Sequence, residues 1–157
     1  MNTELRKMMV KAEGRFLRGE EIEQVRSWAQ GMRARLEQHD RIEAAEERLV
    51  TSAAKAFVEI HPDMAEAIPD FEDKVVRDFK LFVRYVAHCI VRDDITFFRR
   101  AYAEWIAELL SGMTDPDVLV SGYEAMKVAA DELLDPSDAR AMIVYIDLFI
   151  AELEQQK

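Results

Sequence analysis

The stretch FEDKVVRDFKLFVRYVAHCI, residues 71–90, decides the fold class of this chain. Its apolar residues recur every three or four positions, which is the spacing of one face of an amphipathic α-helix. The stripe consists of Phe71, Val75, Phe79, Phe82, Val86 and Ile90. No segment alternates apolar and polar residues over a length that would indicate a β-strand. The sequence therefore predicts an all-α fold.

Chain breakers place further helices before this one. We expect helices over residues 3–17, 20–38 and 40–60. Arg18-Gly19 separates the first two, and His61-Pro62 stops the third because a residue before proline avoids the helical conformation. Asp70 is the expected N-cap of the 71–90 helix.

Aspartates predict the starts of the later helices. Asp93-Asp94 is expected to open a helix that ends at Ser111-Gly112. Asp115-Pro116 and Asp135-Pro136 each place a side-chain acceptor before a proline, a pattern typical of a helix start. Two long helices are expected to follow them.

Composition and charge limit the classes of partner. Half of the 157 residues are apolar, with only five Gly and four Pro, as in a single helical domain. The net charge of −10 disfavours nucleic acid as a partner, since acidic surfaces repel phosphates. No apolar run approaches the roughly 18 residues expected for membrane insertion. The one cysteine, Cys89, leaves no internal disulfide and fits a reducing cytoplasm.

The motifs of common enzymes and metal sites are missing. The chain has no Gly-x-Ser-x-Gly elbow, no phosphate-binding glycine loop and no Cys/His spacing for zinc. No histidine belongs to the Glu-x-x-His pair of helical di-iron proteins. We therefore expect neither an enzyme nor a protein-ligated metal.

One cluster mixes several chemical groups, His88-Cys89-Ile90-Val91-Arg92-Asp93. A tetrapyrrole needs such a mixture: Arg for its propionates, a carboxylate or His for its pyrrole nitrogens or iron, and aromatic walls. Each residue also has a structural interpretation. His88 fits a half-buried helix face, Cys89 an inert small apolar residue, Asp93 an N-cap and Arg92 a surface cation.

Several motifs follow one another in an order that points to a family. They are Glu13-Gly14-Arg15-Phe16-Leu17, Glu20-Glu21-Ile22, the helix 45–60 ending in His61-Pro62, Arg92-Asp93 followed by Phe97-Phe98-Arg99, Ser111-Gly112, Val118 to Glu124, and Asp135-Pro136-Ser137. In this order, over about residues 12–152, the chain resembles the phycobiliproteins, a branch of the globin superfamily. The group that fits best is the bilin-biosynthesis-associated globins.

The resemblance implies a globin-like, all-α domain over residues 1–157, with an N-terminal helical pair (1–38) before a globin core (39–157). In phycobiliproteins a Cys-x-Arg-Asp motif attaches a bilin, a linear tetrapyrrole. Arg92 and Asp93 match that motif, but the attachment position falls on Ile90. Cys89 is one residue too early, about 100° round a helix. A shifted helix end, a bilin held without a bond and a vacant site remain open.

By this resemblance the bilin site is a cleft between the 71–90 helix and the helix that follows it. Asp93 would bind the pyrrole nitrogens, and Arg92, with Arg84 or Lys80, the propionates. The candidate ring-packing residues are Tyr85, Phe97, Phe98, Tyr102 and Trp105. We expect a phycocyanobilin- or biliverdin-like pigment that the protein carries or senses rather than uses to harvest light.

Two alternatives come from other globins. His88 before Phe97-Phe98 and Ala101-Tyr102 resembles the proximal region of sensor-type bacterial globins, which makes His88 a candidate axial ligand of haem iron. The non-haem globin domains of stress-signalling regulators keep the fold without a pigment.

The N-terminal pair mediates subunit pairing in phycobiliproteins, so the resemblance predicts a homodimer through these helices. Their apolar residues are Met8, Met9, Phe16, Ile22, Val25, Trp28 and Met32. The other interpretation is that these side chains pack on their own domain.

Overall fold

The computed structural model describes residues 1–157 and contains helices joined by turns, without a strand. The elements are α1 (Thr3–Lys11), α2 (Gly19–Ile60), α3 (Pro62–Ala67), α4 (Phe71–Arg92), α5 (Ile95–Phe98), the π-helical turn η1 (Arg99–Ala103), α6 (Glu104–Ser111), α7 (Pro116–Leu133) and α8 (Pro136–Glu154). The predicted all-α class is confirmed. No helix has the length and apolarity needed to cross a membrane.

The first helix is shorter than predicted. It ends at Lys11 rather than near Leu17. The chain turns at Gly14, whose φ of 82° lies in the left-handed region that glycine adopts without steric cost. A turn of seven residues, 12–18, therefore connects α1 to α2.

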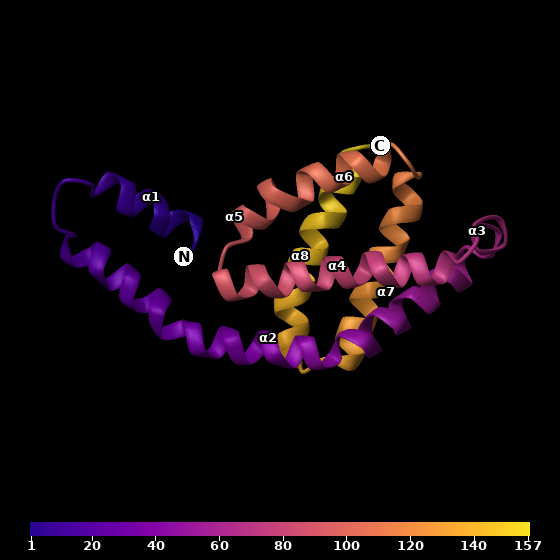
Figure 1. Ribbon diagram of the computed structural model, residues 1–157, viewed down its shortest axis with the longest axis horizontal. Helices are drawn as coiled ribbons and strands as arrows, with labels where there is room; N and C mark the ends of the chain where they lie inside the picture. The colour runs from indigo at the N-terminus through magenta and orange to yellow at the C-terminus, as the bar shows by residue number, and fades with distance from the viewer.

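The helices expected over 20–38 and 40–60 are one continuous helix, α2, of 42 residues. The predicted break was wrong because residues 38–40 contain neither Gly nor Pro. All the buried residues of α2 lie from Ile42 onward. The first half of α2 and α1 form a hairpin that extends beyond the rest of the molecule (Figure 1). The proposed division at residues 38 and 39 thus falls inside a helix, close to the point where burial begins.

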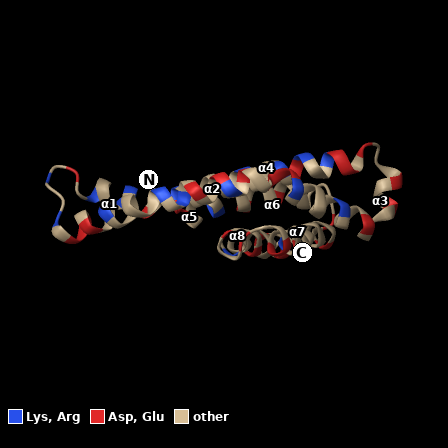
Figure 2. Ribbon diagram, turned by 90° about the horizontal axis from the view of Figure 1, so that it is seen from below, with Lys and Arg blue, Asp and Glu red and all other residues tan.

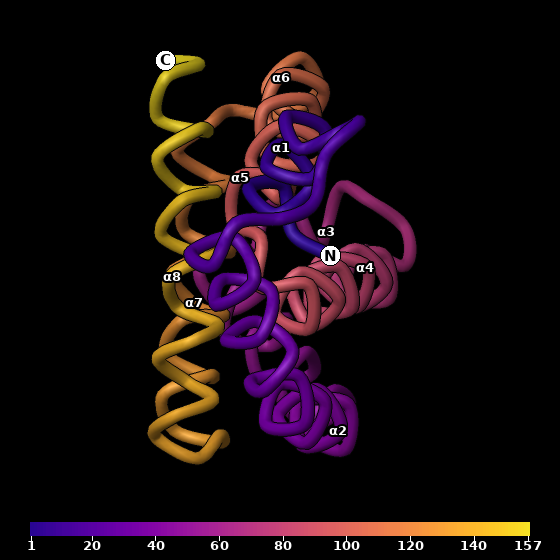
Figure 3. The backbone as a smooth tube through the Cα atoms, turned by 90° about the vertical axis from the view of Figure 1, so that its left-hand side faces the viewer, coloured from indigo at the N-terminus to yellow at the C-terminus, as the bar shows by residue number.

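The helices form two layers. α2, α4 and α6 lie in one layer, and α7 and α8 run side by side beneath it (Figure 2). The same pair lies along one side of the molecule in the view turned by 90° (Figure 3). Phe82 on α4 joins the layers, because its ring centroid lies 4.9 Å from that of Tyr123 on α7 and 5.5 Å from that of Phe149 on α8. Burial of these aromatic rings stabilises the core.

The later helices begin at the expected positions, but only some of the aspartates cap them with a side-chain hydrogen bond. Asp70 precedes α4, yet its side chain accepts no capping hydrogen bond and its φ is 55°. Asp93 is the left-handed residue that ends α4, and Asp94 is the N-cap that accepts from the backbone N–H of Phe97. Asp115 caps α7 by accepting from Asp117 N–H, whereas the Asp135 side chain makes no such bond.

Candidate functional site

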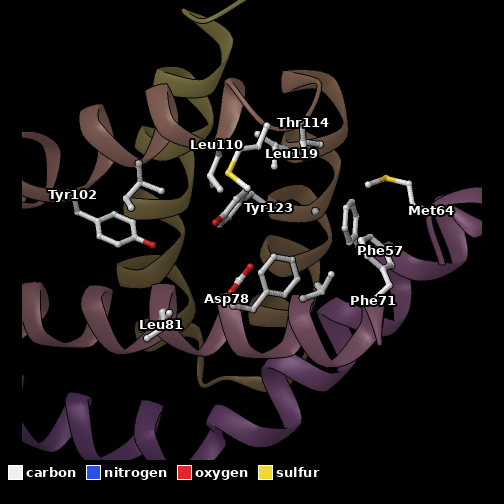
Figure 4. A pocket seen from close by; sticks show the side chains of 15 residues that line it. Phe57, Met64, Phe71, Asp78, Leu81, Tyr102, Leu110, Thr114, Leu119 and Tyr123 are labelled. Carbon is white, nitrogen blue, oxygen red and sulfur yellow. The ribbon is translucent and has the colours of Figure 1, made fainter. Parts of the chain in front are cut away.

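A largely apolar cavity of about 360 Å³ lies between the first half of α4, α6 and α7, with the ends of α2 and α3 closing one side. Figure 4 shows its side chains converging from these helices. The lining residues are Phe57, Met64, Phe71, Val75, Asp78, Phe79, Leu81, Tyr102, Ile106, Leu110, Met113, Thr114, Leu119, Gly122 and Tyr123. The volume and the apolar walls are those of a small-molecule site.

Helical spacing on α4 builds the floor of this cavity. Phe71, Val75, Asp78 and Phe79 recur at three- and four-residue intervals and so share one face. At the far end, Gly122 on α7 lets aromatic rings close the wall. A Cβ at Gly122 would lie 3.3 Å from ring carbons of both Phe57 and Phe79, so a larger residue would force those rings to move.

The largely apolar space is lined by four polar side chains, Asp78, Tyr102, Thr114 and Tyr123. The carboxylate of Asp78 and the hydroxyls of Tyr102 and Tyr123 point toward it (Figure 4). Burial raises the pKa of both tyrosines, and the nearby negative charge of Asp78 raises each pKa further. Both phenols are therefore neutral hydrogen-bond donors at neutral pH. The Asp78 side chain is 56% exposed, which places the carboxylate at the mouth of the cavity.

The cavity also has a basic residue beside it. Nη2 of Arg77 lies 2.9 Å from Oδ1 of Asp78, and the Arg77 side chain is 68% exposed. An arginine in this position can turn to an anionic group at the mouth at little cost, because an exposed ion pair contributes at most about 1 kcal/mol.

Sequence reasoning missed Asp78, although a signal was present. Val75-Val76-Arg77-Asp78 has the spacing of Cys-x-Arg-Asp, with valine in place of the cysteine. The motif was assigned instead to the second Arg-Asp pair, Arg92-Asp93. Only the contents of the cavity wall distinguish the two pairs, since Val75 and Asp78 line it while Arg92 and Asp93 do not.

The structure places Arg92 and Asp93 at the far end of α4. Asp93 lies 15 residues beyond Asp78, about 22 Å along the helix at 1.5 Å per residue. Nη1 of Arg35 lies 3.8 Å from the Asp93 carboxylate. The guanidinium of Arg92 lies 3.9 Å from the centre of the Phe97 ring. Trp28 Nε1 donates to the backbone oxygen of Arg92 at 3.2 Å, so these residues connect α2 to the end of α4.

Asp93 does line a different cavity, of about 390 Å³, between α1, α2 and the end of α4. Its walls are mostly polar, with Gln24, Ser27 and Arg35 among them. A pigment with a large apolar surface gains little there, because apolar burial supplies most of the binding free energy of such ligands.

His88 and Cys89 lie on different sides of α4. The side chain of His88 is exposed, whereas Cys89 is fully buried in the core. Burial raises the pKa of the Cys89 thiol to about 12. Neither residue lines the apolar cavity. These surroundings agree with the structural interpretation of Cys89 as a small residue of the core.

The other residues predicted for the bilin site divide between the core and the surface. Arg84 and Lys80 form ion pairs of 2.6 Å with Glu46 and Glu47 on α2. Tyr85 stacks on Tyr102 with ring centres 4.5 Å apart.

The remaining aromatic candidates lie elsewhere. The Phe97 ring is parallel to that of Tyr85, with the ring centres 6.3 Å apart. Phe98 is fully buried in the core, and Trp105 is 60% exposed. Of all the residues predicted for the site, only Tyr102 lines the cavity.

Comparison with known proteins identifies the family. The family model described as "Phycobilisome protein" matches residues 8–153 of this chain. The chain belongs to the phycobilisome protein family. Among phycobilisome proteins it is 26% identical over 149 residues to allophycocyanin subunit alpha 1 of a Nostoc species, covering 91% of this chain and 92% of the relative. It is 23% identical over 148 residues to the allophycocyanin alpha chain of Arthrospira platensis, covering 90% and 92%.

Another phycobilisome protein, allophycocyanin alpha chain 1 of Microchaete diplosiphon, is 25% identical over 148 residues, with 90% of this chain and 92% of the relative covered. These matches confirm the predicted resemblance to phycobiliproteins. With the all-helical structure, family membership gives the chain the globin-like phycobiliprotein fold.

Proposed function

We propose that this protein binds a linear tetrapyrrole in the cavity between α4, α6 and α7. The observation that carries the proposal is the single carboxylate, Asp78, at the mouth of a largely apolar cavity. An extended bilin presents several pyrrole N–H groups along one edge, and a carboxylate accepts such hydrogen bonds strongly. Family membership supports this class of ligand.

Different residues around the cavity bind different parts of a bilin. Asp78 accepts from the pyrrole N–H groups and favours the protonated, cationic pigment. Arg77 turns from Asp78 toward a propionate, with which its guanidinium forms a charge-assisted pair. The aromatic and aliphatic walls cover the faces of the pyrrole rings, and Tyr102 and Tyr123 offer hydroxyl donors to the lactam oxygens.

The haem alternative lacks an axial ligand at this site. Haem iron in globins is held by a histidine that faces the porphyrin. No histidine lines the cavity, and His88 is exposed on α4. For the pigment-free alternative, the opposing observation is the apolar cavity with a carboxylate at its mouth. Both observations favour a phycocyanobilin- or biliverdin-like pigment.

The role that we propose is to carry or sense a bilin, not to harvest light and not to catalyse a reaction. No thiol lines the cavity for permanent attachment of an antenna pigment.

We also propose that two copies pair through the α1–α2 hairpin. There Phe16 is 97% exposed, Met9 44% and Ile22 42%, and a partner would cover them. The free thiol of Cys89 is consistent with the reducing cytoplasm.

Absorption spectra test the class of ligand. The protein is expressed with haem alone and, separately, with an enzyme pathway that produces a bilin, and is then purified under native conditions. We expect a red absorption band only in the bilin sample. A Soret band alone would instead support haem on His88, and two colourless samples would support the pigment-free regulator.

A further inference from the structure

The cavity offers no side chain that can form a bond to a pigment. Its fifteen lining residues include no cysteine, histidine or lysine. The hydroxyls of Tyr102 and Tyr123 are held protonated by burial. Thr114 has an aliphatic hydroxyl, which is a weak nucleophile. The walls can therefore bind a ligand by contact, hydrogen bonds and charge, but not by nucleophilic addition.

The one thiol of the chain is unsuited to such an addition. Cys89 has no exposed surface, and its pKa of about 12 leaves almost no thiolate at neutral pH. It lies 14 residues beyond Val75, about 21 Å along α4 at 1.5 Å per residue. To reach the cavity, Cys89 would have to leave the hydrophobic core.

We infer that this protein holds its tetrapyrrole without a covalent bond and exchanges it with free pigment. The inference rests on the proposed function of the same cavity. A thioether forms when a thiol sulfur bonds to one carbon of a bilin ethylidene double bond and the thiol proton goes to the other carbon. No group in this cavity can supply that sulfur. The bound pigment is held only by apolar burial, by hydrogen bonds from Tyr102 and Tyr123, and by Asp78 and Arg77, so it dissociates on dilution and leaves completely when the protein unfolds.

Val75 is the position at which one substitution should make the binding of the pigment covalent. Its side chain is 8% exposed and lines the cavity one helical turn before Asp78. Val75→Cys therefore places a thiol against the bound pigment at the cost of one methyl group. Val83→Cys is the matched control, since Val83 is a buried valine of the same helix that does not line the cavity.

The experiment loads each protein with phycocyanobilin, which carries an ethylidene group, and then denatures it in acidic urea. We expect wild type and Val83→Cys to release all their pigment on gel filtration. Val75→Cys should retain pigment, with its mass raised by that of one phycocyanobilin. In the native state, excess biliverdin should replace the pigment of wild type within the incubation but not that of Val75→Cys.

The possible failures are distinct. Pigment that stays on denatured wild type, and is lost in Cys89→Ser, would overturn the inference while leaving the bilin site in place. Release from Val75→Cys would contradict the placement of the pigment against this face of α4. A wild type that takes up no bilin under native conditions would contradict the proposed function, and the inference with it.

Discussion

Three aspartates of similar sequence context have different roles because of what surrounds each one. Asp78 lies at the mouth of an apolar cavity, with Arg77 beside it. Asp93 ends α4 in the left-handed conformation and faces Arg35. Asp94 is 4% exposed and accepts from Thr3 N–H at 2.7 Å, the Thr3 hydroxyl at 2.8 Å and Phe97 N–H at 2.9 Å. The role of each carboxylate is therefore set by its neighbours in space, which the surrounding sequence does not reveal.

Asp94 connects the first helix to the start of α5, and its removal should loosen that connection. We expect Asp94→Ala to lower the free energy of unfolding by about 1–2 kcal/mol, because a helix cap is lost and buried donors lose their acceptor. Urea titration measures the loss. Hydrogen exchange of residues 3–11 should speed up at the same time, since Thr3 is no longer held.

The control is Asp131→Ala, which removes an exposed carboxylate of α7 and should change stability by no more than about 0.5 kcal/mol. Slow exchange of residues 3–11 in Asp94→Ala, equal to that of wild type, would show that Asp94 does not anchor α1.

At the scale of elements, the sequence predicted most helices and misplaced some of their ends. The stripe of α4 and the starts of α7 and α8 were clear because helical spacing specifies the first and a proline in the first turn marks the other two. The continuity of α2 was missed, since residues near position 39 are compatible with either a break or a helix. The π-helical turn η1 contains Tyr102 and has about one more residue per turn than an α-helix. No local pattern in the sequence indicates it.

The α1–α2 hairpin is the element through which we propose that two copies pair. We expect wild type to sediment as a dimer and the double variant Phe16→Glu, Ile22→Glu as a monomer, because buried unpaired charges oppose association. Val128→Glu is the control, as Val128 is an apolar residue of α7 that is 56% exposed and far from the hairpin along the chain. Wild type that sediments as a monomer over the whole concentration range would contradict pairing through this hairpin.

At the scale of the whole molecule, the order of motifs predicted the fold class and the family, but it did not indicate the cavity between α4, α6 and α7. The all-α class and the family are confirmed. The cavity was not predicted because its walls come from α2, α3, α4, α6 and α7, and their contacts are set by packing between helices distant in sequence. Of the two Arg-Asp pairs on α4, only the first has its aspartate, Asp78, at the apolar cavity, whereas Asp93 lines the mostly polar one.

Titration of Asp78→Asn and Asp93→Asn with one bilin would show which carboxylate holds the pigment. Both substitutions replace a partly exposed carboxylate of similar size at one end of an Arg-Asp pair. We expect Asp78→Asn to weaken binding at least about tenfold, roughly 1.4 kcal/mol, and to shift the red band to shorter wavelength, because a charge-assisted hydrogen bond is lost. We expect Asp93→Asn to leave the affinity and the band as in wild type. Loss of binding in Asp93→Asn with unchanged binding in Asp78→Asn would place the pigment at Asp93 instead.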